Sequence, residues 1–499
     1  GGPARVTANA DHRRLAREAG CEGMVLLKND NCVLPLEENA RLALFGKGVF
    51  DYVKGGGGSG DVTVEKIYNL YDGLKLHERK TEIFEPLADY YRKDVQRQYA
   101  AGGLPGLLLE PELPDDLLQE ASSFTDTAVI VISRFSGEGW DRLSVPYAGA
   151  DPNEAAMCVR FADVYENGDF CLTNAEAEMV EKVTGAFSRV IVVLNIGGIM
   201  DTSWFAGNDR IHSVLLAWQS GMEGGFSMAD LLLGVRTPSG KLPDTLADRL
   251  ESYPSTEAFH ISPDYVEYFD DIYVGYRYFE TVPGAAEKVV YPFGYGLSYT
   301  SFAMESLSPC EKDGDLIFPV RVTNTGEYPG KEVVQLYFSA PQGLLGKPSR
   351  QLIAFRKTKD LQPGEYEDLL LTFPISAMAS YDDLGRIRKS AFILEQGVYR
   401  FYLGSSIRDA EELTFSYGAA ENIITEQCTA RMVPSDLPKR MRADGTFEEL
   451  PAGKSHDRYE NAIGWEGSRF DLISPAVRAE DHRVLFTAPA HIMLDDVAD

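Results

Sequence analysis

Four short apolar runs constrain the fold of this chain more than any other feature. They occupy residues 42–45, 128–132, 190–194 and 214–218. Such runs, rich in Val, Ile, Leu and Ala, are typical of strands buried on both faces of a parallel sheet. Helix-like segments at 174–188 and 225–233 alternate with them, and a helix followed by a strand is expected over 11–31. The alternation predicts an α/β domain with a mostly parallel sheet layered with helices.

The pattern changes near residue 300. The chain then shows alternating strands between turn clusters, clearest at 318–323, 332–338 and 399–403. This texture predicts an all-β sandwich of about one hundred residues. We therefore predict three parts: residues 1–300 form the α/β domain, residues 301–418 the β-sandwich, and residues 419–499 a charged extension of mixed pattern.

The formal net charge of −28, from 48 Lys and Arg against 76 Asp and Glu, excludes some classes of partner. It repels polyphosphate backbones, and no Lys/Arg cluster with interleaved aromatic residues occurs, so nucleic acid and anionic membranes are not expected partners. No run of about 18 apolar residues could span a bilayer. Residues 1–5 lack the apolar core of a secretory signal, which favours a cytoplasmic location unless a signal was removed.

The six cysteines are widely scattered, without a C-x-x-C pair or a His/Cys spacing typical of zinc sites. We predict mostly buried thiols and no metal site. The seven histidines indicate no Ser/His/Asp arrangement, so a hydrolase triad is not expected.

Glu138 is the first candidate for chemistry because it stands between two glycines directly after the run at 128–133. Ligands collect where parallel strands leave a sheet at their carboxyl ends, and glycines let the backbone approach a substrate closely. Acid/base work on sugars usually requires a second carboxylate. The alternative is that Glu138 forms an ordinary ion pair with Arg134 or Arg142.

Two other glycine-rich segments follow predicted strands. In Lys54–Asp61 the lysine precedes the glycines, whereas a phosphate loop requires it after them. A surface turn, or backbone packed close to a ligand or neighbouring domain, fits that segment better. In Ser220–Gly225, Glu223 either lies near a site or caps the helix that follows.

Six motifs in order resemble those of the family 3 glycoside hydrolases, in particular the β-glucosidases. They are Glu22–Asn29 with Leu34–Leu36, Gly55–Asp61, Ser136–Arg142, Ala217–Gly225 with Pro238–Pro243, Tyr273–Phe279, and Tyr291–Thr300. The resemblance implies an (α/β)6 sandwich to about Tyr299, followed by a fibronectin type III-like sandwich to about Gly418. The fibronectin-like domain is expected to pack against the first domain and support it.

The resemblance also implies a retaining enzyme with its active site between the (α/β)6 domain and a (β/α)8 barrel. Glu138 matches the general acid/base, and no cofactor is expected. Residues expected to bind substrate are Ser59, Asp61, Trp140, Asp141 and Arg142. A pairing of Arg142 with Asp141 or with backbone is predicted, because it would leave Glu138 free.

The family's nucleophilic aspartate has no match in this chain. The Ser-Asp-Trp stretch is absent, since Ser435-Asp436 is followed by Leu437, and the Lys-His barrel motif is missing. This resembles the subgroup in which the barrel comes last, so the barrel is expected in cis or as a separate chain.

Two alternatives stay open at this point. The first is a chain that binds carbohydrate or supports assembly without hydrolysing anything by itself. The second keeps the hydrolase but changes its β-linked glucoside to a β-xyloside, an α-arabinoside or a plant glycoconjugate.

Overall fold

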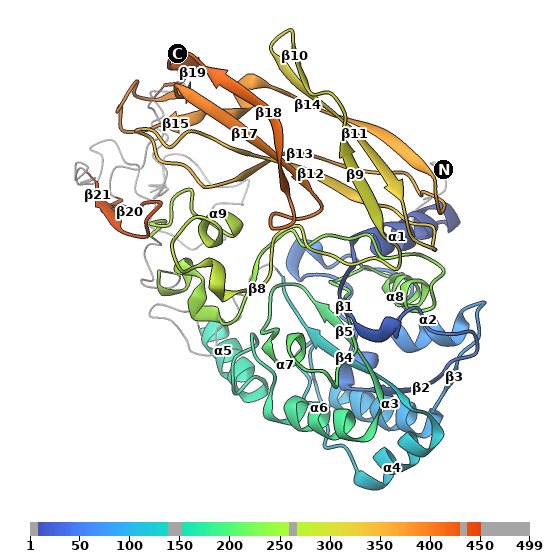
Figure 1. Cartoon of the computed structure of the whole chain (residues 1–499). Helices are drawn as coiled ribbons and strands as arrows, with labels where there is room; N and C mark the ends of the chain where they lie inside the picture. Colours follow the sequence, from blue (N-terminus) through green and yellow to red (C-terminus); the bar gives the residue numbers. More distant parts are fainter. Residues whose placement is uncertain (1–7, 138–151, 259–266, 430–436, 451–499) are drawn as a thin grey trace, which may run out of the picture.

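The computed structural model describes residues 8–137, 152–258, 267–429 and 437–450. Its first half is built on a six-stranded sheet with strand order β1-β6-β5-β4-β2-β3 (Figure 1). The strands are β1 (Val25–Asn29), β2 (Arg41–Phe45), β3 (Glu82–Ile83), β4 (Thr127–Arg134), β5 (Arg189–Ile196) and β6 (Ser213–Leu216). All pairings are parallel except that of the edge strand β1 with β6. The predicted mostly parallel sheet is confirmed.

Helices cover both faces of this sheet. One face packs on α3 (Glu85–Ala100), α4 (Asp115–Phe124), α6 (Asn174–Ala186) and α7 (Ser203–Ala206), and the other on α1 (Ala10–Gly23), α2 (Leu70–Leu76) and α8 (Gly224–Leu232). Successive side chains of a strand point to opposite faces. In β4, Ile130 therefore belongs to the first core and Val131 to the second. Burial on both faces explains why the strands are uniformly apolar.

Smaller elements complete the first half. They are α5 (Pro152–Val164), α9 (Tyr276–Phe279) and the antiparallel pair β7 (Leu246–Ala247) with β8 (Val289–Tyr291).

The second half is a sandwich of two antiparallel sheets. One contains β9 (Phe302–Ser306), β10 (Cys310–Lys312), β11 (Asp315–Asn324) and β14 (Tyr366–Pro374), and the other β12 (Val333–Ser339), β13 (Gln351–Lys357), β17 (Gly397–Gly404) and β18 (Glu411–Ala419). Alternate side chains of β11, among them Phe318 and Val320, are fully buried in the core between the sheets. The predicted β-sandwich is confirmed.

The segment after β18 contains more regular structure than its sequence indicates. Strand β19 (Ile423–Gln427) joins β15 (Ser380–Asp382) and β16 (Ala391–Leu394) in a small sheet. The hairpin of β20 (Lys439–Met441) and β21 (Phe447–Glu449) packs on the first half, where the ring centroids of Phe269 and Phe447 lie 5.4 Å apart. Part of the predicted extension is therefore anchored to both domains.

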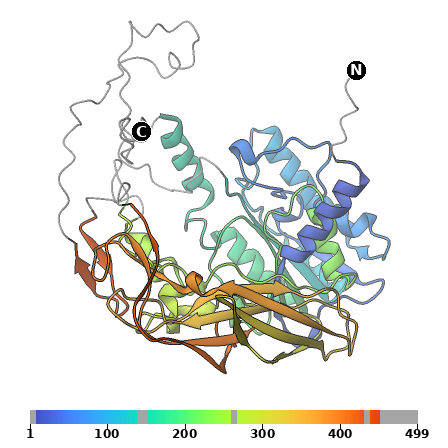
Figure 2. The same ribbon diagram turned by 90° about the horizontal axis from the view of Figure 1, so that it is seen from above.

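The β-sandwich lies along one side of the α/β domain (Figures 1 and 2). At the contact, Glu22 of α1 forms ion pairs with both Lys331 and Lys357 of the sandwich. Nζ of Lys241 lies 2.9 Å from a carboxylate oxygen of Glu332 across the same contact. These charges join the two domains.

The prediction of mostly buried cysteines is wrong. Cys21 and Cys158 are buried, Cys171 and Cys428 are half-buried, and the other two are exposed; all six are free thiols. Across the described ranges, no group of three or more His, Cys, Asp and Glu side chains could hold a metal ion. Among the same residues, no helix has both the length and the apolar character needed to cross a membrane.

Candidate functional site

The carboxyl ends of four neighbouring parallel strands deliver four segments to one edge of the central sheet. We name these segments, residues 46–61 after β2, 135–137 after β4, 197–200 after β5 and 217–221 after β6, the carboxyl edge. Ligands of α/β proteins bind at this end of the strands. The segment that leads to Glu138 leaves β4, which lies between β2 and β5.

Glycines allow the segments of the carboxyl edge to touch through their backbones. A Cβ atom at Gly137 would collide with the backbone nitrogen of Gly57, and one at Gly56 would lie 3.1 Å from the carbonyl oxygen of Ser136. On the other side, a Cβ at Gly197 would lie 2.6 Å from the Ser136 side chain. The glycine-rich loop thus packs closely on another segment of its own domain, and together with Gly197 it positions Ser136 and Gly137 from two sides.

Asn195, near the end of β5, joins two other segments of the carboxyl edge through one buried carboxamide. Its Oδ1 accepts from the backbone N–H of Val53 at 2.7 Å, and its Nδ2 donates to the carbonyls of Val53 at 2.9 Å and Trp218 at 2.7 Å. The side chain is fully buried, so each of these hydrogen bonds is made without competition from water. The segments that follow β2 and β6 are held against the end of β5 as a result.

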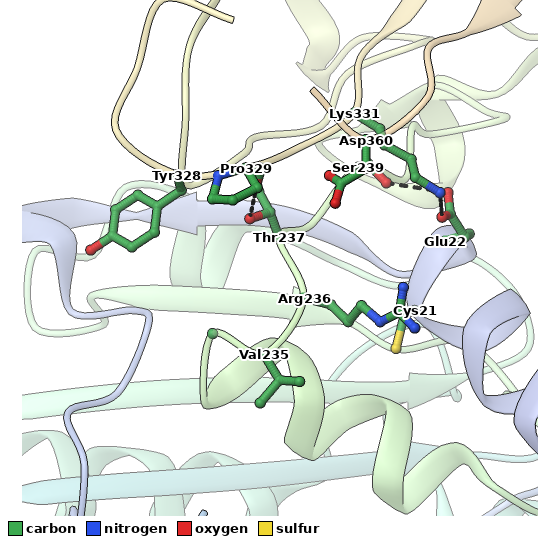
Figure 3. A pocket seen from close by; sticks show the side chains of 11 residues that line it. Cys21, Glu22, Val235, Arg236, Thr237, Ser239, Tyr328, Pro329, Lys331 and Asp360 are labelled. Atoms are coloured by element: carbon green, nitrogen blue, oxygen red, sulfur yellow. Dashed lines mark hydrogen bonds and ion pairs between the residues drawn. The ribbon is translucent and has the colours of Figure 1, made fainter. Parts of the chain in front are cut away.

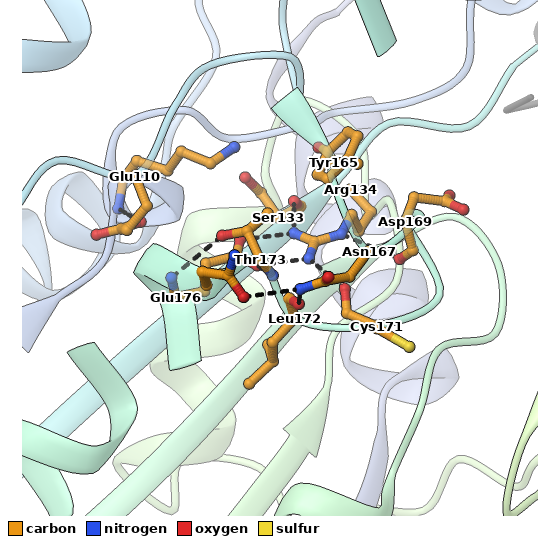
Figure 4. Close-up of polar contacts among 12 residues, drawn as sticks. Glu110, Ser133, Arg134, Tyr165, Asn167, Asp169, Cys171, Leu172, Thr173 and Glu176 are labelled. Carbon is orange, nitrogen blue, oxygen red and sulfur yellow. Dashed lines mark hydrogen bonds and ion pairs between the residues drawn. The ribbon is translucent and has the colours of Figure 1, made fainter. Parts of the chain in front are cut away.

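Arg134, the last residue of β4, has a hydrogen-bond partner for each of its five N–H groups (Figure 4). Two bonds of 2.7 and 2.6 Å go to the carboxylate of Glu176, and three go to the carbonyls of Ser133, Asp169 and Cys171. Burial alone would raise the pKa of the Glu176 carboxyl, but the charge and hydrogen bonds of Arg134 hold it below its ordinary value. Arg134 is thus fully engaged by groups other than Glu138.

A second buried polar group lies beside this ion pair, near the end of β2. Nζ of Lys47 lies 3.4 Å from a carboxylate oxygen of Asp51, and the backbone N–H of Lys47 donates to Oε2 of Glu110 at 2.9 Å. Burial raises the pKa of the Glu110 carboxyl to about 8. With Glu110 uncharged, the two cations Lys47 and Arg134 balance the two anions Asp51 and Glu176.

Several of the predicted site residues lie outside the described residues: Glu138, Trp140, Asp141 and Arg142, and with them the predicted pairing of Asp141 and Arg142. Ser59 and Asp61 are described and exposed, on and just after a single 3-10 turn (Gly58–Gly60) of the carboxyl edge. Asp61 forms an ion pair with Lys54, which closes the glycine-rich loop on itself.

Residues 24–299 match the family model described as the glycosyl hydrolase family 3 C-terminal domain. The chain belongs to glycoside hydrolase family 3. Residues 332–407 match the fibronectin type III-like domain, in agreement with the expected second domain. The predicted family resemblance is confirmed.

Three proteins similar to this chain are named as β-glucosidases. It is 52% identical to beta-glucosidase A of Butyrivibrio fibrisolvens, covering 97% of this chain and 61% of that protein. It is 37% identical to a beta-glucosidase of Ruminococcus albus, covering 88% of this chain and 44% of the other. The crystal structure of a beta-glucosidase from Paenibacillus barengoltzii superposes with a TM-score of 0.77 at 40% identity, over 88% of this chain and 48% of that one. The family 3 chain thus spans about half to three fifths of the length of these relatives.

Glu223 neither caps its helix nor remains free. It occupies the N-cap position of α8 without a side-chain hydrogen bond to the helix, and its carboxylate lies 2.6 Å from Nε of Arg13 in α1. Since the Glu223 side chain is buried, this ion pair fixes α1 against α8. The alternative in which the Glu223 side chain caps α8 by a hydrogen bond is therefore not found.

A pocket of about 140 Å³ lies between the two domains, apart from the carboxyl edge (Figure 3). Its lining includes Glu22 with its partner Lys331, and Arg236, which pairs with Glu18. The hydroxyl of Thr237 donates to the carbonyl of Pro329 at 2.6 Å across the pocket wall. The contacts of Glu22 with Lys331 and of Thr237 with Pro329 join the two domains, so this pocket serves the domain contact and we place the candidate site at the carboxyl edge.

Sequence reasoning missed four side chains that organise this edge: Asn195, Gln219, Glu110 and Glu176. Only Glu176 had a readable signal, because Thr173-x-x-Glu176 before a helix is a capping box, and both of its hydrogen bonds are present.

Proposed function

We propose that this chain supplies the general acid/base, Glu138, of a retaining β-glucosidase whose nucleophile lies on a (β/α)8 barrel outside these 499 residues. In this proposal residues 1–300 bear the acid/base, residues 301–418 support them, and residues 419–499 lead towards the barrel. The observation that supports it most is the packing of Ser136 and Gly137, immediately before Glu138, against glycines of the carboxyl edge. Membership of family 3 supports the same assignment.

The chemistry follows the double-displacement scheme. A carboxylate on the barrel attacks the anomeric carbon while Glu138, about 5 to 5.5 Å away, gives its proton to the glycosidic oxygen as the C–O bond breaks. The electron pair of that bond stays on the leaving oxygen. Glu138 then takes a proton from the water that releases the sugar.

A proton donor must stay protonated until the leaving group departs, so its pKa must be raised. Burial against the sugar and the anionic nucleophile would supply this, whereas a free cation nearby would oppose it. Two cations that flank the segment, Lys54 and Arg134, are both neutralised by carboxylates. We propose that Asp141 does the same for Arg142.

The substrate class is a β-linked glucoside, as the names of the relatives suggest. Ser59, Asp61, Trp140, Asp141 and Arg142 are proposed to line the leaving-group side, where polar groups bind hydroxyls and aromatic faces stack on sugars. A β-xyloside, an α-arabinoside or a plant glycoconjugate would be the alternative if the barrel selects another sugar.

The test uses the complete enzyme, meaning this chain together with its barrel. Glu138→Ala is expected to slow hydrolysis of poor leaving groups by about 100-fold or more, with partial rescue by azide. Glu82→Ala, an exposed carboxylate on the edge strand β3, is the matched control. Unchanged activity of Glu138→Ala would contradict the assignment of Glu138 as the general acid/base.

A second assay uses the 499-residue chain alone on an aryl β-glucoside. No turnover is expected, because one of the two carboxylates is missing. Robust turnover at one active site per chain would contradict the proposal that the nucleophile lies on a barrel outside this chain. If the complete enzyme binds sugar but does not turn it over, the alternative of a carbohydrate-binding chain is favoured.

A further inference from the structure

Trp218 has a backbone conformation that bulky residues rarely adopt. Its φ of 53° lies in the left-handed region, which costs an aromatic residue about 1 to 3 kcal/mol. The conformation is held because the Trp218 carbonyl accepts from Asn195 and the partly buried ring packs on the core beneath the carboxyl edge. The chain turns sharply here, directly after β6, and the next residue is Gln219.

Gln219 reaches across to the segment that leaves β4. Its Nε2 donates to the carbonyl oxygen of Ser136 at 3.2 Å. A Cβ atom at Gly197 would lie 2.6 Å from the same Nε2, so only glycine at 197 leaves room for this amide. Ser136 is therefore enclosed by the Gly56–Gly57 backbone, by Gly197 and by Gln219.

The loop that bears Gln219 is itself fixed at both ends. On one side Asn195 holds the Trp218 carbonyl. On the other, the N–H of Gly221 donates to the carbonyl of Lys54 at 2.8 Å, and the Tyr52 hydroxyl donates to the carbonyl of Gly221 at 2.9 Å. A side chain on a loop that is fixed at both ends by hydrogen bonds can hold its partner in one position.

We propose that Gln219 is the positioning residue for the general acid/base: its carboxamide fixes the Ser136 carbonyl, two residues before Glu138, and so sets where the proton donor stands relative to the leaving oxygen. The inference rests on the proposed function of Glu138. It assigns Gln219 no contact with substrate.

The proposal has a consequence that a purely structural role lacks. Protonation of the leaving oxygen matters when the leaving group is poor and hardly matters when it is a stable anion. Loss of positioning should therefore slow poor leaving groups selectively. A general loss of stability or of substrate binding would slow all substrates alike.

The experiment measures kcat/KM of the complete enzyme on aryl β-glucosides whose phenols span a wide range of acidity. Gln219→Met keeps the length of the side chain but removes the donor. We expect about a 10- to 100-fold loss on the poorest leaving group and less than about 3-fold on the dinitrophenyl glucoside. The side chain in Gln219→Asn is too short to reach Ser136, so this variant should show the same selective loss. It replaces Gln219→Met in the test if the Met variant does not fold.

Gln98→Met is the matched control. Gln98 also bonds to backbone, donating to the Leu109 carbonyl at 2.8 Å, but it lies on α3 and outside the carboxyl edge. Its substitution should leave the dependence on leaving group unchanged.

Glu138→Ala is measured in parallel so that the two proposals can fail separately. If Glu138→Ala produces the selective loss and the Gln219 variants do not, or lose activity equally on all substrates, the positioning role is overturned. If Glu138→Ala itself shows no selective loss, the proposed function is overturned and this inference with it.

Discussion

Arg134 and Glu176 form a two-pronged ion pair, with N–O distances of 2.7 and 2.6 Å, that is almost completely buried beneath the segment leading to Glu138. Arg134 ends β4 and Glu176 stands in the first turn of α6, so the pair ties the strand to the helix that covers it. Glu176 also accepts from the Thr173 N–H at 3.0 Å. One carboxylate thereby caps a helix and neutralises a buried cation.

Glu176→Gln should destabilise the α/β domain strongly. The variant leaves Arg134 buried without its counter-charge, which costs about 3 to 5 kcal/mol. Glu181→Gln on the same helix removes the partner of Arg210 in an exposed pair and should cost less than about 1 kcal/mol. Urea unfolding of the two variants at neutral pH measures the difference, and similar midpoints would contradict the role of burial.

Glu110 should make the fold less stable as the pH rises. Its pKa is raised from 4.5 in the unfolded chain to about 8 in the folded state. Between these two pH values the folded state keeps a proton on Glu110 that the unfolded state has lost. Its contribution to stability is fully present below pH 4.5 and falls by about 1.4 kcal/mol per pH unit until the folded-state pKa is passed.

Glu110→Gln removes this titration and should flatten the decline in urea midpoint between pH 5 and pH 9. Glu112→Gln, an exposed carboxylate in the same loop, should leave the decline as it is in the wild type. Parallel pH profiles for wild type and Glu110→Gln would show that the buried carboxyl is not protonated.

Gly137→Ala should lower activity by shifting the backbone before Glu138, without removing any functional group. The added methyl group would collide with the Gly57 backbone, so the segment before Glu138 must shift. A displacement of about 1 Å in an active site can cost 100-fold, and we expect at least a 10-fold fall in kcat/KM of the complete enzyme. Gly185→Ala, whose Cβ would meet no atom within 4 Å, is the control that should retain full activity.

Glu22→Gln should loosen the contact between the two domains. The change leaves Lys331 and Lys357 close together without the carboxylate that both engage. Because these groups are about one third exposed or less, the effect should be modest, about 1 kcal/mol, and larger at low salt. Scanning calorimetry should show the unfolding of the β-sandwich separating from that of the α/β domain.

The control for this contact is Glu18→Gln, which breaks pairs with Arg14 and Arg236 inside the α/β domain. It should leave the two unfolding transitions together. Separation of the transitions in both variants would mean that Glu22 has no special part in the contact.

Sequence reasoning predicted strands whose burial is uniform or alternates regularly and missed a strand that is mostly exposed. The strand β4 was predicted because all of its side chains are buried, which leaves an unbroken apolar run. Strand β19 was not predicted, because four of its five side chains are exposed and its partner β16 lies about thirty residues earlier in the chain.

The site was predictable only where its residues form a local motif. The glycine-rich loop and Glu138 could be found because glycines and strand ends leave a readable pattern. Gln219 could not, since its partner Ser136 lies 83 positions away and a single hydrogen bond to a carbonyl leaves no trace in composition or period.

All the contacts that shape the carboxyl edge, those of Asn195, of Gln219 and of the glycines, join residues of the α/β domain to one another. The described part of the carboxyl edge is therefore held together by contacts within this domain and does not depend on a barrel. With the barrel on a separate polypeptide, turnover would follow the fraction of chains in complex and would be lost on dilution. A flexible linker between the two would restore it by raising their effective concentration to the millimolar range.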